Sequence, residues 1–490
     1  MATSLAKQLA RKWQRFLHIT PSAVLVLVWN FFMYSYYILL SRSTAVFTTE
    51  TAPAPWYKYG LVIIYCLGYF FFPLFGLLAD VWIGRYKAIL IGIVLCFMSW
   101  IIGGIGFIVE SYFDHTEAVI WTFFSFVYIT CFCGFSSFSA NIIQYNIDQL
   151  VGASADQLNS VIYWHILSEP LVLFLFYLLQ CLFYSSKYFI MITFIASGLS
   201  VSLVLVSHSF FKHKLENISL IKNPIKLIVR VLCYARKHKY PENRSALTYW
   251  EEEAPSRLDL GKDKYGGPFT EEEVEDVKTV LHMLPLFIGF FVVIISDDYY
   301  WSAVDGFTLP TCLAVTGSQY HFCSVILMLI YLFFIRVCFY KYIPSMLTRM
   351  SVGIFLALIV TVSKVIIFVI ERSHPDINNI VSLEFTVAQS PVHMRGVMVG
   401  LWYVTSLGIS YLINVTVNFL FHCESQYICT SFYYYISKSV LVLIILIVFV
   451  ILAKRYKYRV RENEVNIFQI VDDHYQRYME QEEKYKKDNI

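Results

Sequence analysis

The stretch PSAVLVLVWNFFMYSYYILLS, from Pro21 to Ser41, decides the fold class of this chain. It contains no Asp, Glu, Lys, Arg or His along its whole length. An α-helix of about 20 apolar residues is long enough to cross the hydrocarbon core of a bilayer. Because the block is full length and follows a polar segment, we expect it to act as its own signal anchor, with no removable signal peptide.

The rest of the chain repeats this pattern. Of its 490 residues, 58% are hydrophobic and only 15% are charged, whereas soluble domains are about 45–50% apolar and about 25% charged. The apolar blocks are continuous rather than alternating, which argues against a β-barrel. We therefore predict an all-α membrane protein with twelve transmembrane helices. The candidate spans cover about 22–41, 59–80, 88–109, 118–142, 161–183, 187–209, 279–302, 322–343, 351–371, 377–390, 396–421 and 433–453.

The placement of Lys and Arg orients these helices, because cytoplasmic loops carry an excess of both. Basic residues gather before the first span, after the second and at the start of the C-terminal tail, so we expect both termini to be cytoplasmic. A polar segment separates spans one to six from spans seven to twelve. The chain then divides into a cytoplasmic amphipathic N-terminus, a six-helix bundle, a cytoplasmic linker, a second six-helix bundle and a cytoplasmic tail, at residues 1–20, 21–209, 210–277, 278–453 and 454–490.

Several segments and residue types bear on partners. The N-terminus and the tail segment 464–482 place apolar residues at helical spacing, which suits contact with a lipid bilayer or with the protein itself. The nearly neutral linker is either a solvated tether or a regulatory segment, and the linker or tail could take a cytoplasmic protein partner. Cys423 and Cys429, on a predicted outer loop, are spaced so that a disulfide could form.

Other function classes find no support in the sequence. A net charge of only +3 gives no indication of nucleic-acid binding. There is no glycine-rich phosphate loop, no His/Cys cluster at metal-ligand spacing and no nucleophile beside a base. We therefore expect neither an enzyme nor a cofactor.

Three stretches carry a resemblance to a known family. They read GLLADVWIGR from Gly76 to Arg85, RSALTYWEEEAPSRLDLGKDKYGGPFTEEEVEDVK from Arg244 to Lys278, and EFTVAQSPVHMRGVMVGLWY from Glu384 to Tyr403. Together they resemble the proton-coupled oligopeptide transporter family of the major facilitator superfamily. The resemblance implies two six-helix bundles that move di- and tripeptides, or histidine in some branches, by alternating access with protons. It also implies a structural gate loop that contains Gly76, Asp80, Gly84 and Arg85.

Glu384 lies inside a predicted span, where a charged side chain costs about 2.5–3.5 kcal/mol on insertion scales. The resemblance implies that Glu384 binds the amino terminus of a peptide. An ammonium group is a suitable partner for a carboxylate in a low-dielectric cavity. From the residues alone, Glu384 could instead pair with Lys364 or be protonated. We expect a substrate site that draws on Glu384, Tyr34, Asn30, Glu169 and Trp402. Candidates for proton coupling or gating are Glu169, Glu384, His165, Asp297, Asp298 and Lys364.

Several of these candidates also have a purely structural interpretation. Glu169 precedes Pro170, which opens the helix backbone, so its carboxylate could bond neighbouring groups. His165 could be a packing residue. Asp297 and Asp298 could simply face water near the outer mouth.

The sequence departs from the family at positions that would handle protons and peptide ends. Helix one of the family carries two carboxylates and an arginine, where this chain has Val26, Trp29 and Asn30. On helix four the family has a Lys or Arg that would bind the peptide carboxylate, and this chain has Ser139 at that position. Proton coupling through helix one therefore cannot operate as it does in the family.

Three functions follow from these observations. The leading hypothesis is alternating-access transport of small peptides, amino acids or related solutes, with or without protons. The alternatives are a non-transporting sensor or scaffold and an uncoupled uniporter. In each case we expect a multi-pass protein of the plasma membrane or of an endolysosomal membrane.

Overall fold

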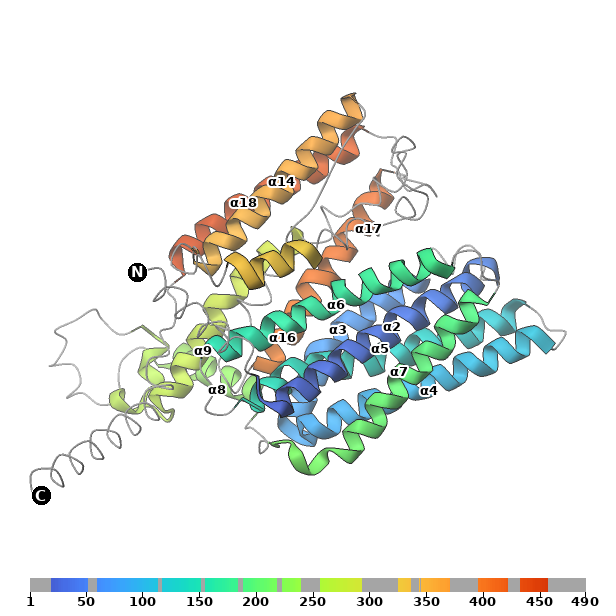
Figure 1. The fold of residues 1–490 in the computed structure, drawn as a ribbon. Coiled ribbons are helices and arrows are strands. Elements are labelled where there is room, and N and C mark those ends of the chain that lie inside the picture. The colour runs from blue at the N-terminus through green and yellow to red at the C-terminus, as the bar shows by residue number, and fades with distance from the viewer. Residues whose placement is uncertain are drawn as a thin grey trace, which may run out of the picture.

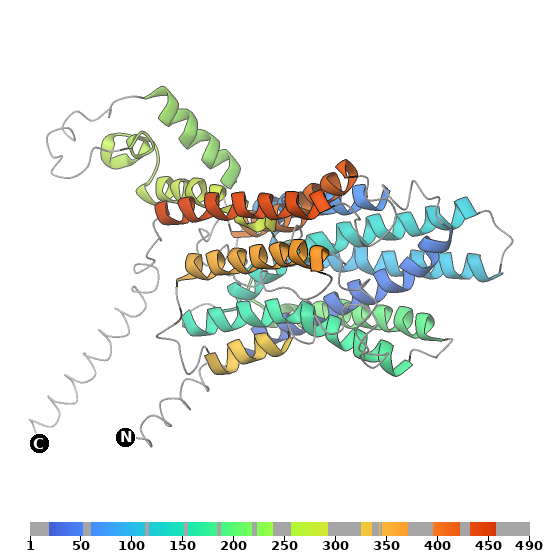
Figure 2. The ribbon, with the colours of Figure 1, turned by 90° about the horizontal axis from the view of Figure 1, so that it is seen from above.

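The computed structural model describes residues 19–51, 60–112, 117–150, 155–183, 188–217, 223–238, 256–292, 325–335, 343, 345–370, 395–421 and 432–456. Within these residues the regular structure is helical, and the only extended pairing is an isolated bridge between Lys262 and Phe269. The helices run roughly side by side in both ribbon views (Figures 1 and 2). The prediction of an all-α chain is confirmed.

Six long helices form the first half of the fold. They are α2 (Pro21–Thr51), α3 (Leu61–Leu78), α4 (Arg85–Tyr112), α5 (Glu117–Asp148), α6 (Ala155–Phe183) and α7 (Phe189–Phe210), with the π-helical turn η2 (Ala79–Ile83) between α3 and α4. Several helices exceed their predicted spans: α2 runs on to Thr51, α5 runs on to Asp148 and α6 begins at Ala155. Hydropathy marks only the apolar part of a helix, whereas hydrogen bonding continues into the polar ends.

The first half is held together by close approaches between helices. A Cβ atom on Gly92 would lie 2.7 Å from the Gly134 carbonyl oxygen, and one on Gly134 would lie 2.8 Å from the Gly92 carbonyl oxygen. Glycine at both positions therefore lets α4 and α5 pack backbone to backbone, as small residues do between membrane helices. Ser137 adds a hydrogen bond from its hydroxyl to the Ala88 carbonyl at 3.0 Å.

The second half is described in shorter pieces. They are α9 (Glu271–Met283), the 3-10 helix η7 (Leu284–Phe291), the π-helical turn η9 (Tyr331–Ile335), α14 (Met346–Ile370), α16 (Arg395–Tyr403), the π-helical turn η12 (Val404–Ile409), α17 (Ser410–Leu420) and α18 (Phe432–Arg455). Helices α14 and α18 lie side by side in both ribbon views (Figures 1 and 2). Their buried residues Ile354 and Phe449 share one apolar core with Phe290 of η7.

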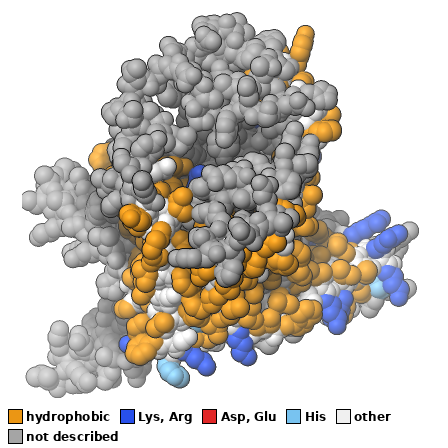
Figure 3. Space-filling view, turned by 90° about the vertical axis from the view of Figure 1, so that its right-hand side faces the viewer, with side chains coloured by type: hydrophobic (Ala, Val, Ile, Leu, Met, Phe, Trp, Pro, Cys, Tyr) orange, Lys and Arg blue, Asp and Glu red, His pale blue; other side chains and the backbone are white. Residues whose placement is uncertain are grey.

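Eight of the described helices are long and apolar enough to cross a membrane, which makes the chain a multi-pass integral membrane protein. They span Pro21–Ala45, Ile63–Ile83, Arg85–Val109, Trp121–Asp148, Gln157–Gln180, Phe189–Phe210, Val397–Val417 and Tyr433–Arg455. Met346–Val362 is a shorter apolar helix at the predicted ninth span. Figure 3 shows the expected surface, on which the described side chains are mostly hydrophobic and Lys and Arg stand near the edge.

Some predictions fall on other parts of the chain. The predicted seventh, eighth and tenth spans lie partly or wholly outside the described residues, so the total of twelve stays a prediction. The amphipathic segments at the two termini also lie outside them, as do Cys423 and Cys429.

The described part of the linker is folded. Asn223 caps α8 (Pro224–Lys237) by accepting hydrogen bonds from the backbone N–H groups of the first turn, and Thr270 and Glu273 form a capping box at the start of α9. Val231 of α8 and Val277 of α9 are buried in the same apolar core as the second half of the chain. Of the two interpretations of the linker, the solvated tether does not hold for these residues.

Candidate functional site

The predicted gate loop joins α3 to α4 through the π-helical turn η2. Gly76 accepts a hydrogen bond from the Ala79 N–H. The turn ends at Gly84, whose φ of 89° and ψ of 141° lie in a region that residues with a Cβ atom rarely adopt. Because the backbone reverses at Gly84, Arg85 begins α4 with its side chain directed back toward η2.

Arg85 lies between two carboxylates in a buried ionic cluster. Its Nε atom is 2.7 Å from Asp80 Oδ1 and its Nη1 atom is 2.6 Å from Asp148 Oδ2. Gln144 donates to the other oxygen of Asp148 at 3.0 Å. Of the four predicted gate-loop residues, Asp80 and Arg85 take part in this cluster and Gly76 and Gly84 shape the backbone beside it, while Asp148 is an addition. One guanidinium group thus ties η2, α4 and α5.

The helix-one positions where the resemblance expects titratable groups are filled by core residues. Val26, Trp29 and Asn30 are exposed by no more than 2%. The Trp29 indole N–H donates to the Ser207 hydroxyl at 2.8 Å. Trp29 and Val26 belong to the apolar core of the first half, so this face of α2 is built to pack rather than to titrate.

His165 connects α6 to α5 and α2. Its Nε2 atom lies 2.9 Å from the Asn146 side-chain nitrogen, and its backbone carbonyl accepts a hydrogen bond from Asn30 at 3.5 Å. The ring is buried. Two of the predicted site residues, Asn30 and His165, are therefore in contact.

Glu169 differs from His165 because its side chain is exposed. It lies one helical turn further along α6, next to Pro170. Among the described residues, its electrostatic partners are tyrosines on three other helices, namely Tyr34, Tyr37, Tyr69 and Tyr403. The exposed side chain of Glu169 is thus coupled electrostatically to four phenol groups.

These tyrosines come from both halves of the chain. Tyr34 lies on α2 and Tyr403 lies on α16, and their phenol groups interact electrostatically. Tyr403 also stacks on Phe72 of α3, with ring centroids 4.2 Å apart. The space beside Glu169 therefore lies where the two halves meet.

An aromatic side chain of α5 packs against two of the tyrosines. Phe135 stacks on Tyr37 with ring centroids 4.4 Å apart and meets Tyr34 edge-on at 5.4 Å. These contacts orient the two tyrosines of α2. Trp402 instead packs in the apolar core of the second half and touches Tyr403, so the structure brings its neighbour, and not Trp402, to Glu169.

A second contact between the halves was not predicted. Arg349 of α14 donates to the Tyr331 hydroxyl at 2.7 Å and to the Tyr163 hydroxyl at 3.4 Å. The two phenol oxygens are 3.3 Å apart. We call these three residues the Arg349 clasp, because Tyr163 belongs to α6 and the other two belong to the second half.

The remaining candidates can be placed only in part. Glu384, Asp297 and Asp298 lie outside the described residues, and Lys364 lies on α14 with its side chain outside them. Tyr69 and Tyr403 were missed. Tyr403 could have been found, because it closes the third quoted stretch, whereas Tyr69 has no sequence signal beyond its helix. The described residues contain no group of three or more His, Cys, Asp and Glu side chains suited to a metal.

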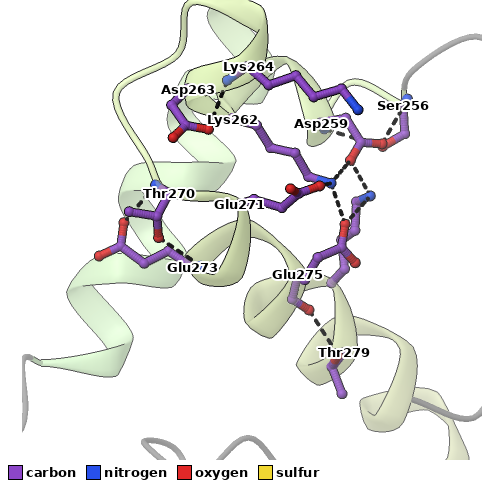
Figure 4. A network of polar contacts seen from close by, with 11 residues as sticks. Ser256, Asp259, Lys262, Asp263, Lys264, Thr270, Glu271, Glu273, Glu275 and Thr279 are labelled. Carbon is purple, nitrogen blue, oxygen red and sulfur yellow. Dashed lines mark hydrogen bonds and ion pairs between the residues drawn. The ribbon is translucent and has the colours of Figure 1, made fainter. Parts of the chain in front are cut away.

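The linker carries a polar cluster of its own (Figure 4). The Lys262 ammonium group lies 3.0 Å from Asp259, 3.1 Å from Glu271 and 2.6 Å from Glu275. Lys278 also binds Asp259 and Glu275. We call these five residues the linker cluster, and they join the 3-10 turn at Asp259 to α9.

The linker cluster shifts the pKa values of its members. Burial alone would raise the pKa of Asp259, but hydrogen bonds from Lys278, Ser256 and Lys262 outweigh burial and hold that pKa well below its usual range. Burial likewise acts against the ionised forms of Lys262 and Glu275. Hydrogen bonds within the cluster nevertheless raise the pKa of Lys262 and lower the pKa of Glu275.

Comparison with known proteins defines the fold. No family model matches the sequence. An auto-inhibited POT family peptide transporter matches with a TM-score of 0.59 and 16% identity, over 90% of this chain and 98% of that one. The POT family transporter PepTSo matches with a TM-score of 0.61 and 14% identity, over 89% and 98%. A POT family transporter in complex with 5-aminolevulinic acid matches with a TM-score of 0.52 and 14% identity, over 88% and 96%.

These similarities show that the chain has the fold of POT family transporters. They extend along nearly the whole length of each protein. The fold predicted from the resemblance is therefore confirmed at the level of architecture.

Proposed function

We propose that this chain is a divergent member of the oligopeptide transporter family. In this proposal it carries small cation-bearing solutes, such as peptides, amino acids or related amines, by alternating access. The observation that supports this most is Glu169, an accessible carboxylate among tyrosines from both halves of the fold. An ammonium group offers three donors to such a carboxylate, and charge-assisted hydrogen bonds are about twice as strong as neutral ones.

The arrangement of contacts supports alternating access. Carriers built from two bundles rock one bundle against the other around a site between them. Phe72 with Tyr403 and the Arg349 clasp both connect the two halves. Such contacts between the halves are the ones that rocking would make and break.

Proton coupling, where it occurs, has to use groups outside helix one. The predicted candidates are Glu169, Glu384, His165, the pair Asp297 and Asp298, and Lys364. We further propose that both termini are cytoplasmic and that the chain works in the plasma membrane or in an endolysosomal membrane.

Uptake into proteoliposomes tests the proposal. Purified protein is reconstituted and given labelled dipeptides and amines, with and without an imposed pH gradient. We expect saturable uptake that Glu169→Gln and Glu384→Gln each abolish for solutes bearing an amine. Unchanged uptake in both variants would refute the assignment of these carboxylates.

Two other outcomes identify the alternatives. Uptake that is indifferent to the gradient identifies a uniporter. No uptake at any pH, together with a protein partner whose recovery depends on the linker or the tail, identifies a sensor or scaffold.

A further inference from the structure

The helices of the first half around Glu169 carry almost no positive charge. Among α2, α3, α5 and α6, which supply Glu169 and most of its neighbours, the sequence contains a single Lys or Arg. This residue is Arg42, which donates to the Tyr177 hydroxyl of α6 at 3.2 Å. Among the described residues, no Lys or Arg interacts with Glu169.

Three other basic residues in or beside the described spans are engaged elsewhere. Arg85 is bound by Asp80 and Asp148, and Arg349 forms its clasp. The Lys438 ammonium lies over the Tyr434 ring, 4.5 Å from its centroid. Ser139 of α5, where a base would meet a substrate carboxylate, is buried and neutral.

The neighbours of Glu169 suit a cation in a second way. Aromatic faces attract ammonium groups through the ring quadrupole, and the attraction strengthens when the pair is desolvated. Tyr34, Tyr69 and Tyr403 supply both rings and hydroxyl groups. A carboxylate of the solute in the same space would be repelled by the negative charge of Glu169. It would find no cationic partner among the described residues.

We propose that the Glu169 site selects solutes by their ammonium group and does not hold their carboxylate. The inference rests on the proposed function and names its substrate class. Amines and peptide amides bind more tightly than the matching zwitterionic peptides. Tyr403 gives the site its link to the second half, since a solute between Tyr34 and Tyr403 touches both halves at once.

Binding to the purified protein tests this with three matched probes. They are the dipeptide alanyl-alanine, its C-terminal amide and its N-acetyl derivative, measured by isothermal titration. We expect the amide to bind roughly tenfold or more tightly than the dipeptide, because the dipeptide brings an unpaired charge. The N-acetyl derivative, which has no ammonium group, should not bind.

Variants assign the effect to Glu169. Glu169→Gln keeps the size of the side chain and should weaken amide binding by roughly ten- to a hundredfold. Tyr403→Phe keeps the ring, so it should weaken amide binding less than Glu169→Gln does. Glu272→Gln, at an exposed position on α9, is the matched control and should change nothing.

The outcomes separate the inference from the proposed function. Equal binding of dipeptide and amide overturns the inference while leaving transport in place. Loss of dipeptide binding alone in Lys364→Gln identifies a carboxylate site and also overturns it. Selective amide binding without any uptake into proteoliposomes supports the inference and overturns transport.

Discussion

At the scale of single residues, Gly400 shows how closely the two halves approach. A Cβ atom at this position would lie 2.5 Å from Pro73 Cα, 2.6 Å from Pro73 N and 2.9 Å from the Phe72 carbonyl carbon. All three are backbone atoms, so they cannot move aside as a flexible side chain can. The contact lies one turn before Tyr403 and therefore sets the distance at which Tyr403 meets Phe72.

We expect Gly400→Ala to destabilise the protein. Overpacking of this kind costs about 1–3 kcal/mol, because α16 must move away from α3. The midpoint of thermal unfolding in detergent measures the effect. Gly104→Ala is the matched control, since the nearest atoms to its Cβ are in ordinary contact at 3.5 and 3.6 Å. Equal midpoints for Gly400→Ala and the unmodified protein would contradict the close approach.

At the scale of elements, the ionic cluster at Arg85 shows what joins helices at their polar ends. One guanidinium group satisfies carboxylates from η2 and α5, and all three side chains are almost fully buried. Removing one member of a buried ionic cluster leaves the others desolvated without compensation. Removing one charge of the cluster should therefore cost more stability than neutralising all three charges together.

Arg85→Gln should accordingly lower the free energy of unfolding by about 3–5 kcal/mol. The triple variant Asp80→Asn, Arg85→Gln and Asp148→Asn should recover much of this loss, since it leaves no unpaired charge. Chemical or thermal unfolding in detergent compares the two. A triple variant no more stable than Arg85→Gln would show that packing, and not charge, holds the junction.

The linker cluster leads to a prediction about pH. The pKa values of Asp259 and Glu275 are lowered, so their contribution to stability is present above their ordinary values of about 4 and is lost only as pH falls through the lowered values. The pKa of Lys262 is raised, so its contribution is fully present below its ordinary value of about 10 and is lost only as pH rises through the raised value. Between about pH 5 and 9 the cluster should not respond to pH.

Hydrogen exchange checks this expectation. Protection of residues 256–283, corrected for the intrinsic pH dependence of exchange, should stay level from about pH 5 to 9 and fall in acid below about pH 4. A change in protection between pH 5 and 7 would contradict it.

At the scale of the whole molecule, the Arg349 clasp and the aromatic contact at Tyr403 connect the same two halves through different helices. Each must loosen if one half rocks against the other. The clasp consists of hydrogen bonds from a charged donor, which contribute about 1.5–3 kcal/mol each. It is therefore strong enough to bias a conformational equilibrium without locking it.

Arg349→Gln should shift that equilibrium toward the state in which α6 and α14 are apart, by roughly tenfold. Distances between spin labels on the starts of these two helices measure the populations. Arg42→Gln is the control, because Arg42 donates to Tyr177 within the first half only. A shift of equal size in Arg42→Gln would mean that the clasp has no special role.

The fold was predictable from the sequence, but the site was predictable only in part. An uninterrupted apolar block from Pro21 to Ser41 is enough to predict a spanning helix, because length and hydropathy are local properties. The pairing of Tyr34 with Tyr403 depends on how distant segments pack, and no periodic pattern reports that. The linker was open to misreading, because Lys262 looks like a solvated charge until its carboxylate partners come together around it.

The π-helical turn η12 constrains the length of the chain as well as its composition. A π-helical turn holds an extra residue, and each residue advances about 100° around an α-helix. Losing one residue between Val404 and Ile409 would swing Tyr411 away from Tyr65, whose ring centroid is 6.3 Å from its own. Ser410 would also leave the Phe291 carbonyl that it reaches at 2.6 Å. Related chains should therefore tolerate changes of residue type between Val404 and Ile409 more readily than insertions or deletions.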